Sequence, residues 1–253
     1  MTSPAQTVPA ATLVIFRHGA DGDAPQLLMV QRSKAMRFAG GAAVFPGGRV
    51  DPEDHALAAR LLPGAEPADA ASRVAALRET LEETGLALGL ARAVSAAEAR
   101  DARAMLLEHG ALAPVLERFG WQLDDRALTA FAHWCPDLPG AFDTRFYLAD
   151  LGTGAVDITV DETENTHLFW ASAAQALAKA DQGEISVIFP TRRNLERLAL
   201  FASFAEAQAH AQATPVTCIT PWRELREDGE WLLIPEGLGY PVTGQPLSEV
   251  QRG

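Results

Sequence analysis

The chain contains very little cysteine, which excludes some kinds of stabilisation and catalysis. Only Cys135 and Cys218 occur among its 253 residues. Two cysteines alone cannot form a disulfide framework or a zinc site, so two reduced thiols are expected. A catalytic thiol is not expected, because the sequence shows no base paired with either cysteine.

Long apolar runs are also absent. No stretch approaches the ~18 uncharged apolar residues that a membrane-spanning helix needs. Residues 1–11 lack the basic and apolar regions of a secretory signal peptide. We therefore expect no transmembrane helix and a cytoplasmic protein.

Basic residues are in the minority. There are 21 Lys and Arg against 33 Asp and Glu, which gives a formal net charge of -12. Such a field repels phosphate, so general binding to nucleic acid or to an anionic membrane is excluded. A phosphate-bearing ligand would need a bound cation or a local basic cluster. Residues 17–49 offer such a cluster with a local charge of +3, formed by Arg17, Arg32, Lys34, Arg37 and Arg49 against Asp21 and Asp23.

What is present is typical of a folded α/β or α+β protein. Hydrophobic residues make up 48% and charged residues 21%, and β-type runs alternate with helical periodicity. The predicted strands are 11–17 and 27–31 (a hairpin), 129–135, 142–149, 167–170, and a second hairpin within 217–235. The first predicted helices are 53–62 and 69–84, the second with Asp69 as N-cap and Gly85 after its end. Two or three shorter helices are predicted between 91 and 130, with breaks near Gly110 and Gly120. The last predicted helix is 191–210, with Thr191 as N-cap.

The most informative segment is residues 78–86, Arg-Glu-Thr-Leu-Glu-Glu-Thr-Gly-Leu. Glu79, Glu82 and Glu83 stand at positions i, i+3 and i+4, so one helix face presents all three carboxylates. Their mutual repulsion destabilises a bare helix, and Mg²⁺ or Mn²⁺ would relieve it, because these ions prefer oxygen ligands and share them with phosphates. A solvated acidic face fits the glutamates alone equally well, so the context must decide.

The context is the segment Phe45-Pro46-Gly47-Gly48 upstream. Together the two segments resemble the signature of the Nudix hydrolase superfamily, G-x5-E-x7-R-E-U-x-E-E-x-G-U with U apolar. The second half matches, with Thr80 in place of the first apolar residue. The first half carries an insertion of 16 residues between Gly48 and Arg78. Counting forward from Gly48 puts Asp54 at the early glutamate position and counting back from Arg78 puts Ala70 there, so this position stays unassigned.

The resemblance implies a fold and a site. The fold is an α/β/α sandwich with a mixed central sheet, in one domain over residues 11–241 with a helical insertion at about 91–130 and tails at 1–10 and 242–253. The implied metal ligands are Glu79, Glu82 and Glu83, with Mg²⁺ or Mn²⁺ as cofactor. Arg78 would orient a glutamate, and Gly47 and Gly48 would let backbone approach the metal or the phosphates. A further acid from a later loop would act as base or extra ligand, and the candidates are Asp161, Glu162 and Glu164.

A second resemblance concerns the substrate. The segment Leu28–Ser33, Arg37, Gly41 and the Phe-Pro-Gly-Gly turn are similar to a motif of Nudix enzymes that split coenzyme A, in the branch that includes the peroxisomal CoA diphosphatases of animals. It implies that CoA or an acyl-CoA is cleaved at its diphosphate and that Arg32 and Arg37 contact phosphate. The expected partner is a small nucleotide, with a homodimer as a possible assembly.

Three alternatives are weighed against this hypothesis. ADP-ribose or NADH could be the substrate of the same chemistry. A non-catalytic nucleotide sensor is disfavoured because all three glutamates are kept and no basic helix-turn-helix follows. Removal of mRNA caps is disfavoured by the net charge of -12.

Overall fold

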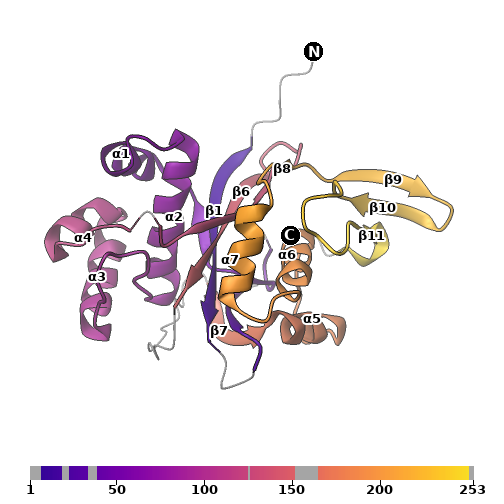
Figure 1. Cartoon of the computed structure of the whole chain (residues 1–253), viewed down its shortest axis with the longest axis horizontal. Helices are drawn as coiled ribbons and strands as arrows, with labels where there is room; N and C mark the ends of the chain where they lie inside the picture. Colours follow the sequence, from indigo (N-terminus) through magenta and orange to yellow (C-terminus); the bar gives the residue numbers. More distant parts are fainter. Residues whose placement is uncertain (1–6, 19–22, 34–38, 125, 152–164, 251–253) are drawn as a thin grey trace, which may run out of the picture.

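The computed structural model describes residues 7–18, 23–33, 39–124, 126–151 and 165–250. A central sheet lies between two helical layers (Figure 1). One layer consists of α1 (Pro52–Leu61), α2 (Pro67–Thr84), α3 (Ala96–His109) and α4 (Leu112–Phe119). The other consists of α5 (Ala173–Asp181), α6 (Phe189–Leu198) and α7 (Phe204–Ala213). The expected α/β/α sandwich is confirmed.

The sheet is mixed, as expected. Its strand order is β3-β2-β1-β6-β5-β8, with β4 also paired to β1 and β7 to β2. The pairs β1–β6 and β5–β8 are parallel, and the others are antiparallel. The strands are β1 (Val8–Arg17), β2 (Gln26–Arg32), β3 (Ala43–Val44), β4 (Gly47–Arg49), β5 (Thr129–Trp134), β6 (Phe142–Asp150), β7 (Asn165–Ser172) and β8 (Cys218–Ile219). A separate sheet is formed by β9 (Trp222–Arg226), β10 (Gly229–Leu233) and β11 (Gly244–Pro246), followed by a short 3₁₀ helix, Leu247–Glu249.

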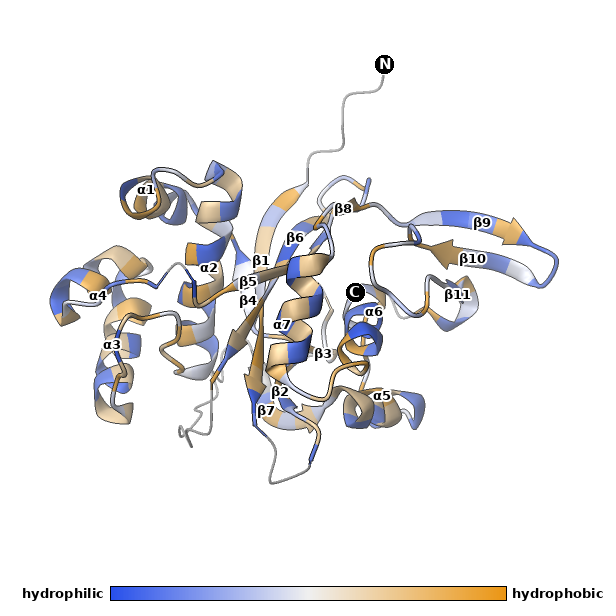
Figure 2. Cartoon of the chain, viewed as in Figure 1, coloured by the Kyte–Doolittle hydropathy of each residue, from blue (hydrophilic) through white to orange (hydrophobic). Residues whose placement is uncertain are grey.

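The core is divided by the sheet. In β1, Leu13 and Ile15 pack against the α1–α4 layer, whereas Val14 and Phe16 pack against the α5–α7 layer. Because β1 is covered on both faces, it is a continuous apolar run rather than an alternating one. Hydrophobic positions gather between the layers in Figure 2, whereas the projecting β9 is exposed along its length.

Helix α2 differs from expectation only at its start. Pro67 fixes the first helical position, and the Glu66 carboxylate accepts hydrogen bonds from the N–H groups of Ala68 and Asp69. Glu66, not Asp69, is therefore the N-cap. The helix ends as predicted at Gly85, in the left-handed conformation with φ 76°. The breaks near Gly110 and Gly120 are confirmed as left-handed ends of α3 and α4.

The helix predicted for 191–210 is two helices. Thr191 lies buried inside α6, which begins at Phe189 with a proline in its first turn. Ser203 caps α7 through Glu206 N–H. At the chain ends, β1 begins at Val8 within the expected tail 1–10, and β11 lies within the expected tail 242–253.

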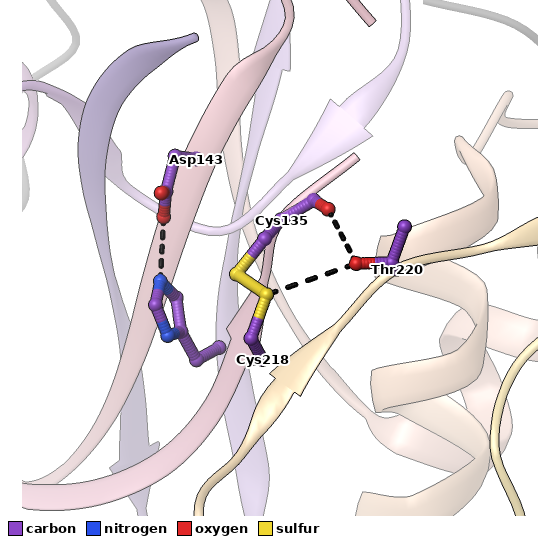
Figure 3. Close-up of a disulfide and its surroundings, with 5 residues drawn as sticks. Cys135, Asp143, Cys218 and Thr220 are labelled. Carbon is purple, nitrogen blue, oxygen red and sulfur yellow. Dashed lines mark hydrogen bonds and ion pairs between the residues drawn. A yellow bond between two sulfur atoms is a disulfide. The ribbon is translucent and has the colours of Figure 1, made fainter. Parts of the chain in front are cut away.

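The expectation of two reduced thiols was wrong, because Cys135 and Cys218 form a disulfide (Figure 3). The parallel pairing of β5 with β8 brings the Cα atoms of Cys135 and Cys218 to 5.6 Å from each other. This distance is within the range that a disulfide spans. The two residues are 83 positions apart, so only long-range strand pairing reveals their proximity. Among the described residues, no helix is both long and apolar enough to cross a bilayer.

Candidate active site

The two halves of the Nudix-like signature meet in space. The N–H group of Gly47 donates a 3.0 Å hydrogen bond to the Glu83 carboxylate. A Cβ atom at Gly48 would stand 2.3 Å from the Glu79 carboxylate oxygen, so this approach requires glycine. The intervening insertion forms α1 and the start of α2. The two glycines at the start of β4, called the glycine turn below, therefore lie against the glutamate face of α2.

Arg78 is the centre of an ion-pair network under this face. Its side chain is only 4% exposed and makes a bidentate pair with Asp54, with N–O distances of 3.0 Å from both Nε and Nη2. Nη1 lies 3.1 Å from Glu79 and 3.3 Å from Glu82. Burial opposes the charge of Arg78, but the Asp54 hydrogen bonds and the nearby Glu79, Asp54 and Asp51 carboxylates outweigh it and raise its pKa. Arg78 thus contacts two of the three glutamates through Nη1, whereas its bidentate pair is with Asp54.

Asp54 is the acidic residue at the early glutamate position of the signature, which counting along the sequence left unassigned. It is 1% exposed, lies in the first turn of α1, and faces Arg78 from the end of the insertion nearest Gly48. Its second oxygen also accepts from the Asp51 N–H, which closes a capping box on α1. Counting forward from Gly48 therefore finds the acidic partner, and Ala70, which is buried in the apolar core, has no such role.

The three glutamates place carboxylate oxygens on one face of α2. Glu79 and Glu82 are 15% and 31% exposed on their side chains, and Glu83 is buried. Burial, opposed by Arg78 and reinforced by the charges of Glu83 and Glu82, raises the pKa of Glu79 to about 8. Three oxygen donors that destabilise one another in this way are chemically suited to a hard cation such as Mg²⁺ or Mn²⁺.

A cavity of about 780 Å³ adjoins this turn. Gly47 and Gly48 line one part of it, and Arg32 lines it from the end of β2. Within the described part of the chain, the buried Arg32 Nε has no hydrogen-bond partner. The remaining wall is mainly apolar and includes Phe45, Trp134, Phe142, Phe146, Phe189 and Leu232. Phe142, Thr144 and Phe146, at alternate positions of β6, line the cavity from the sheet.

Several predicted site residues lie outside the described residues. These are Arg37 and Lys34 in the basic segment, and Asp161, Glu162 and Glu164 in the acidic one. The structure thus brings together Arg78, the three glutamates and the glycine turn. Arg32 lines the same cavity as the two glycines. Sequence reasoning missed the Asp51 carboxylate and the Arg49 carbonyl, which both contact Arg78 Nη2. The signal available was their position directly after the glycine turn.

Comparison with known proteins identifies the family. A solved Nudix hydrolase of Alicyclobacillus acidocaldarius is 30% identical, with 81% of this chain and 96% of that chain covered and a TM-score of 0.68. The chain belongs to the Nudix hydrolase family. An acyl-coenzyme A diphosphatase of Gallus gallus, NUDT19, is 26% identical over 275 residues, which cover 85% of this chain and 73% of that protein. No family model matches the chain.

Family membership relates the glutamates of α2 to a class of enzyme. The chain is a Nudix hydrolase, an enzyme class that acts on diphosphates linked to another group. The curated relative belongs to the CoA diphosphatase branch that the basic segment and the Phe-Pro-Gly-Gly turn resemble.

Proposed function

We propose that this Nudix hydrolase cleaves the diphosphate of coenzyme A or an acyl-coenzyme A, with Mg²⁺ or Mn²⁺ held by Glu79, Glu82 and Glu83. The observation that carries the proposal is the apolar cavity beside the glycine turn. A CoA ester has a diphosphate that suits the glutamate face and an apolar arm that suits the cavity. The acyl-coenzyme A diphosphatase among the relatives supports the same substrate class.

Each group of residues at the site has a separate role in this proposal. Glu79, Glu82 and Glu83 would hold a cation that would supply Lewis-acid activation of the attacking water and neutralisation of charge on the leaving oxygen. Arg78 keeps Glu79 and Glu82 in place through its 3.1 Å and 3.3 Å contacts. Gly47 and Gly48 let the phosphates approach the backbone. Glu162 and Glu164 remain candidates for the base or an additional ligand.

The cavity dimensions favour a bulky substrate over a compact one. A volume of about 780 Å³ lies within the range of sites that enclose a whole small ligand. An ADP-ribose substrate would place a second polar ribose against Phe142, Phe146 and their apolar neighbours and leave its hydroxyls poorly paired. For this reason we place ADP-ribose and NADH second.

A substrate panel tests the proposal. CoA, acetyl-CoA, a long-chain acyl-CoA, ADP-ribose and NADH are incubated with Mg²⁺ or Mn²⁺, and the products are resolved by mass. We expect cleavage of the CoA compounds into a 3′,5′-phosphorylated adenosine and a phosphopantetheine, dependent on the metal. Clear ADP-ribose hydrolysis without CoA hydrolysis would assign the second substrate class instead.

Arg32 provides a test of phosphate recognition. If Arg32 contacts the 3′-phosphate of CoA, Arg32→Ala removes a charge-assisted contact worth about 1.5–3 kcal/mol. We then expect kcat/KM for CoA to fall roughly ten- to a hundredfold, with a much smaller fall for 3′-dephospho-CoA. The same discrimination is predicted for Arg37→Ala, and Lys34→Ala is the control with little effect on either substrate. Equal losses on both substrates would mean that the arginine serves the diphosphate or the fold.

Two leucines of the β9–β10 hairpin form a matched pair for testing the apolar wall, because only one of them lines the cavity. Leu232 of β10 lines the cavity, whereas Leu225 of β9 is 83% exposed. Leu232→Asn should raise KM for a long-chain acyl-CoA by about tenfold, because ~1.4 kcal/mol of apolar burial is lost. Free CoA should be much less affected, and Leu225→Asn should change neither substrate. An unchanged KM for the acyl ester in Leu232→Asn would show that this cavity does not bind the acyl chain.

A further inference from the structure

Four residues with metal-binding side chains gather at one edge of the main sheet. Trp134 of β5 pairs with Thr144 of β6, which sets Cys135 opposite Asp143. His133 pairs with Cys218 of β8 in the parallel ladder. Because residues two apart in a strand share a face, His133 and Cys135 face the same way as their neighbours Cys218 and Asp143. The intervening Trp134 points into the α5–α7 core.

Three of the four residues bring their ligand atoms close enough to share one ion. The ligand atoms of His133, Cys135 and Asp143 all lie within 4.8 Å of one another, and each of these residues is half-buried. The His133 Nε2 lies 2.5 Å from the Asp143 carboxylate. The fourth candidate, the exposed Cys218, is bonded to Cys135, and Thr220 holds the pair from the side (Figure 3).

We propose that reduction of the Cys135–Cys218 disulfide creates a zinc site formed by both thiolates, His133 Nε2 and Asp143. A dithiol reductant supplies two electrons and two protons, becomes a disulfide itself, and leaves two thiols at this edge. Zn²⁺ then displaces the two thiol protons. The proton that His133 Nε2 shares with Asp143 leaves that nitrogen, with Nδ1 of the neutral ring protonated instead, so that Nε2 and the carboxylate can both bind the metal. The resulting set of two sulfurs, one nitrogen and one oxygen suits tetrahedral zinc.

The donor chemistry separates this site from the glutamate face. Thiolates and imidazole select zinc, whereas carboxylate oxygens suit Mg²⁺ or Mn²⁺. The two sites share no residue. The zinc form and the disulfide form would both attach β8 to β5. Since β8 leads into β9 and β10, which supply Arg223 and Leu232 to the cavity wall, either form would hold that wall against the sheet.

The test uses Co²⁺ as a spectroscopic substitute for zinc. The full chain is reduced with a water-soluble phosphine, desalted without oxygen, and titrated with Co²⁺ in excess Mg²⁺. We expect one equivalent of Co²⁺ with sulfur-to-cobalt charge-transfer absorption and the intense visible bands of tetrahedral cobalt, both abolished by Zn²⁺. The oxidised chain should show neither feature, and thiol counting should find two thiols after reduction and none before.

Variants assign the ligands. Cys218→Ser and Asp143→Asn should weaken Co²⁺ binding at least about tenfold, and His133→Ala should remove the tetrahedral bands. The control is Asp137→Asn, an exposed aspartate two residues beyond Cys135, which should bind as the wild type does. Circular dichroism checks the fold of each variant. Alkylation of the reduced wild-type thiols with iodoacetamide gives a test without any substitution, and it should abolish binding.

Three results would overturn the proposal. One is a reduced chain that shows no sulfur-to-cobalt absorption. Another is equally tight binding by the oxidised chain. The third is wild-type affinity in Cys218→Ser and Asp143→Asn, which would place the ion elsewhere.

Discussion

Two buried arginines lie on opposite sides of the sheet and differ in how their charge is balanced. Arg78 of α2 is 4% exposed and is surrounded by Asp54, Asp51, Glu79 and Glu82. Arg197 of α6 is 1% exposed. Its described partners are the Phe131 carbonyl at 2.9 Å, His210 at 3.3 Å and the faces of Phe131 and Tyr240.

The electrostatic consequences are opposite. Hydrogen bonds and carboxylate charges raise the pKa of Arg78 despite its burial, whereas burial lowers the pKa of Arg197. Arg78 therefore sits in a site with an excess of negative charge, which suits a cation. Arg197 connects α6 to β5 through a backbone carbonyl and aromatic rings, and its described contacts include no carboxylate. Of these two arginines, the one surrounded by carboxylates is the one that lies beside the glutamate face.

The largest effect should come from removing a carboxylate of the glutamate face. Glu83→Gln keeps the shape of the side chain and an oxygen acceptor for Gly47 N–H, but removes the charge. We expect kcat to fall by about three orders of magnitude, the scale reached when an electrostatic group at a reacting centre is lost. Glu82→Gln should behave alike. Turnover is measured at saturating Mg²⁺, with thermal unfolding as the check on folding.

The control carboxylate lies in the other layer. Glu196 of α6 pairs with Arg193 at 2.7 Å and has a pKa raised by burial, so it resembles the site glutamates in environment but not in place. Glu196→Gln should keep kcat. Near-full activity of Glu83→Gln with Mg²⁺, or undiminished wild-type activity in excess chelator, would refute the metal assignment.

The next effect concerns the partner of Arg78. Asp54→Asn leaves a buried guanidinium without its bidentate carboxylate, and breaking such a pair costs about 3 kcal/mol or more. We expect this loss in the free energy of unfolding, measured with urea, together with a lower kcat because Glu79 and Glu82 lose a fixed anchor. Asp51→Asn is the control: Asp51 is 44% exposed at 3.3 Å, so it should cost less than about 1 kcal/mol. Equal costs for the two variants would contradict the assignment of Asp54.

The third effect tests the close approach of the glycine turn. In Gly48→Ala the new methyl would meet the Glu79 carboxylate at 2.3 Å and displace it. A misplacement of about 1 Å in a reacting geometry costs about a hundredfold in rate, which is the fall in kcat that we expect. Gly64→Ala, where a Cβ meets no atom within 4 Å, should leave kcat unchanged. If both variants turn over like the wild type, the contact between β4 and α2 does not shape the site.

How far the sequence predicts this site depends on the distance over which each signal acts. The glutamate spacing and the Gly85 terminus are local, so periodicity and capping predicted them. Asp54 lies across an insertion, and counting from its two ends gave two answers. Only the contact with Arg78 resolves them.

The features that the sequence did not predict are long-range or lack a local signal. The Cys135–Cys218 pair follows from β5–β8 pairing between segments 83 residues apart. The break between α6 and α7 falls in Ala199-Leu200-Phe201-Ala202, which contains no glycine or proline. The apolar cavity collects side chains from β5, β6, α6 and β10, and no window of sequence contains them together.

The smallest effect should come from the other arginine. Arg197→Met replaces a buried cation that has no carboxylate partner with an apolar side chain that can still pack on Phe131 and Tyr240. The gain from no longer burying a charge offsets part of the loss. The Phe131 carbonyl loses a donor, so a net destabilisation of about 1–2 kcal/mol is expected. The cavity wall and the glutamate face keep their residues, so kcat should stay within about twofold. A fall in kcat comparable with that of Asp54→Asn, in a variant that unfolds at nearly the wild-type urea concentration, would show that α6 is coupled to the site across the sheet and that the two arginines are not functionally distinct.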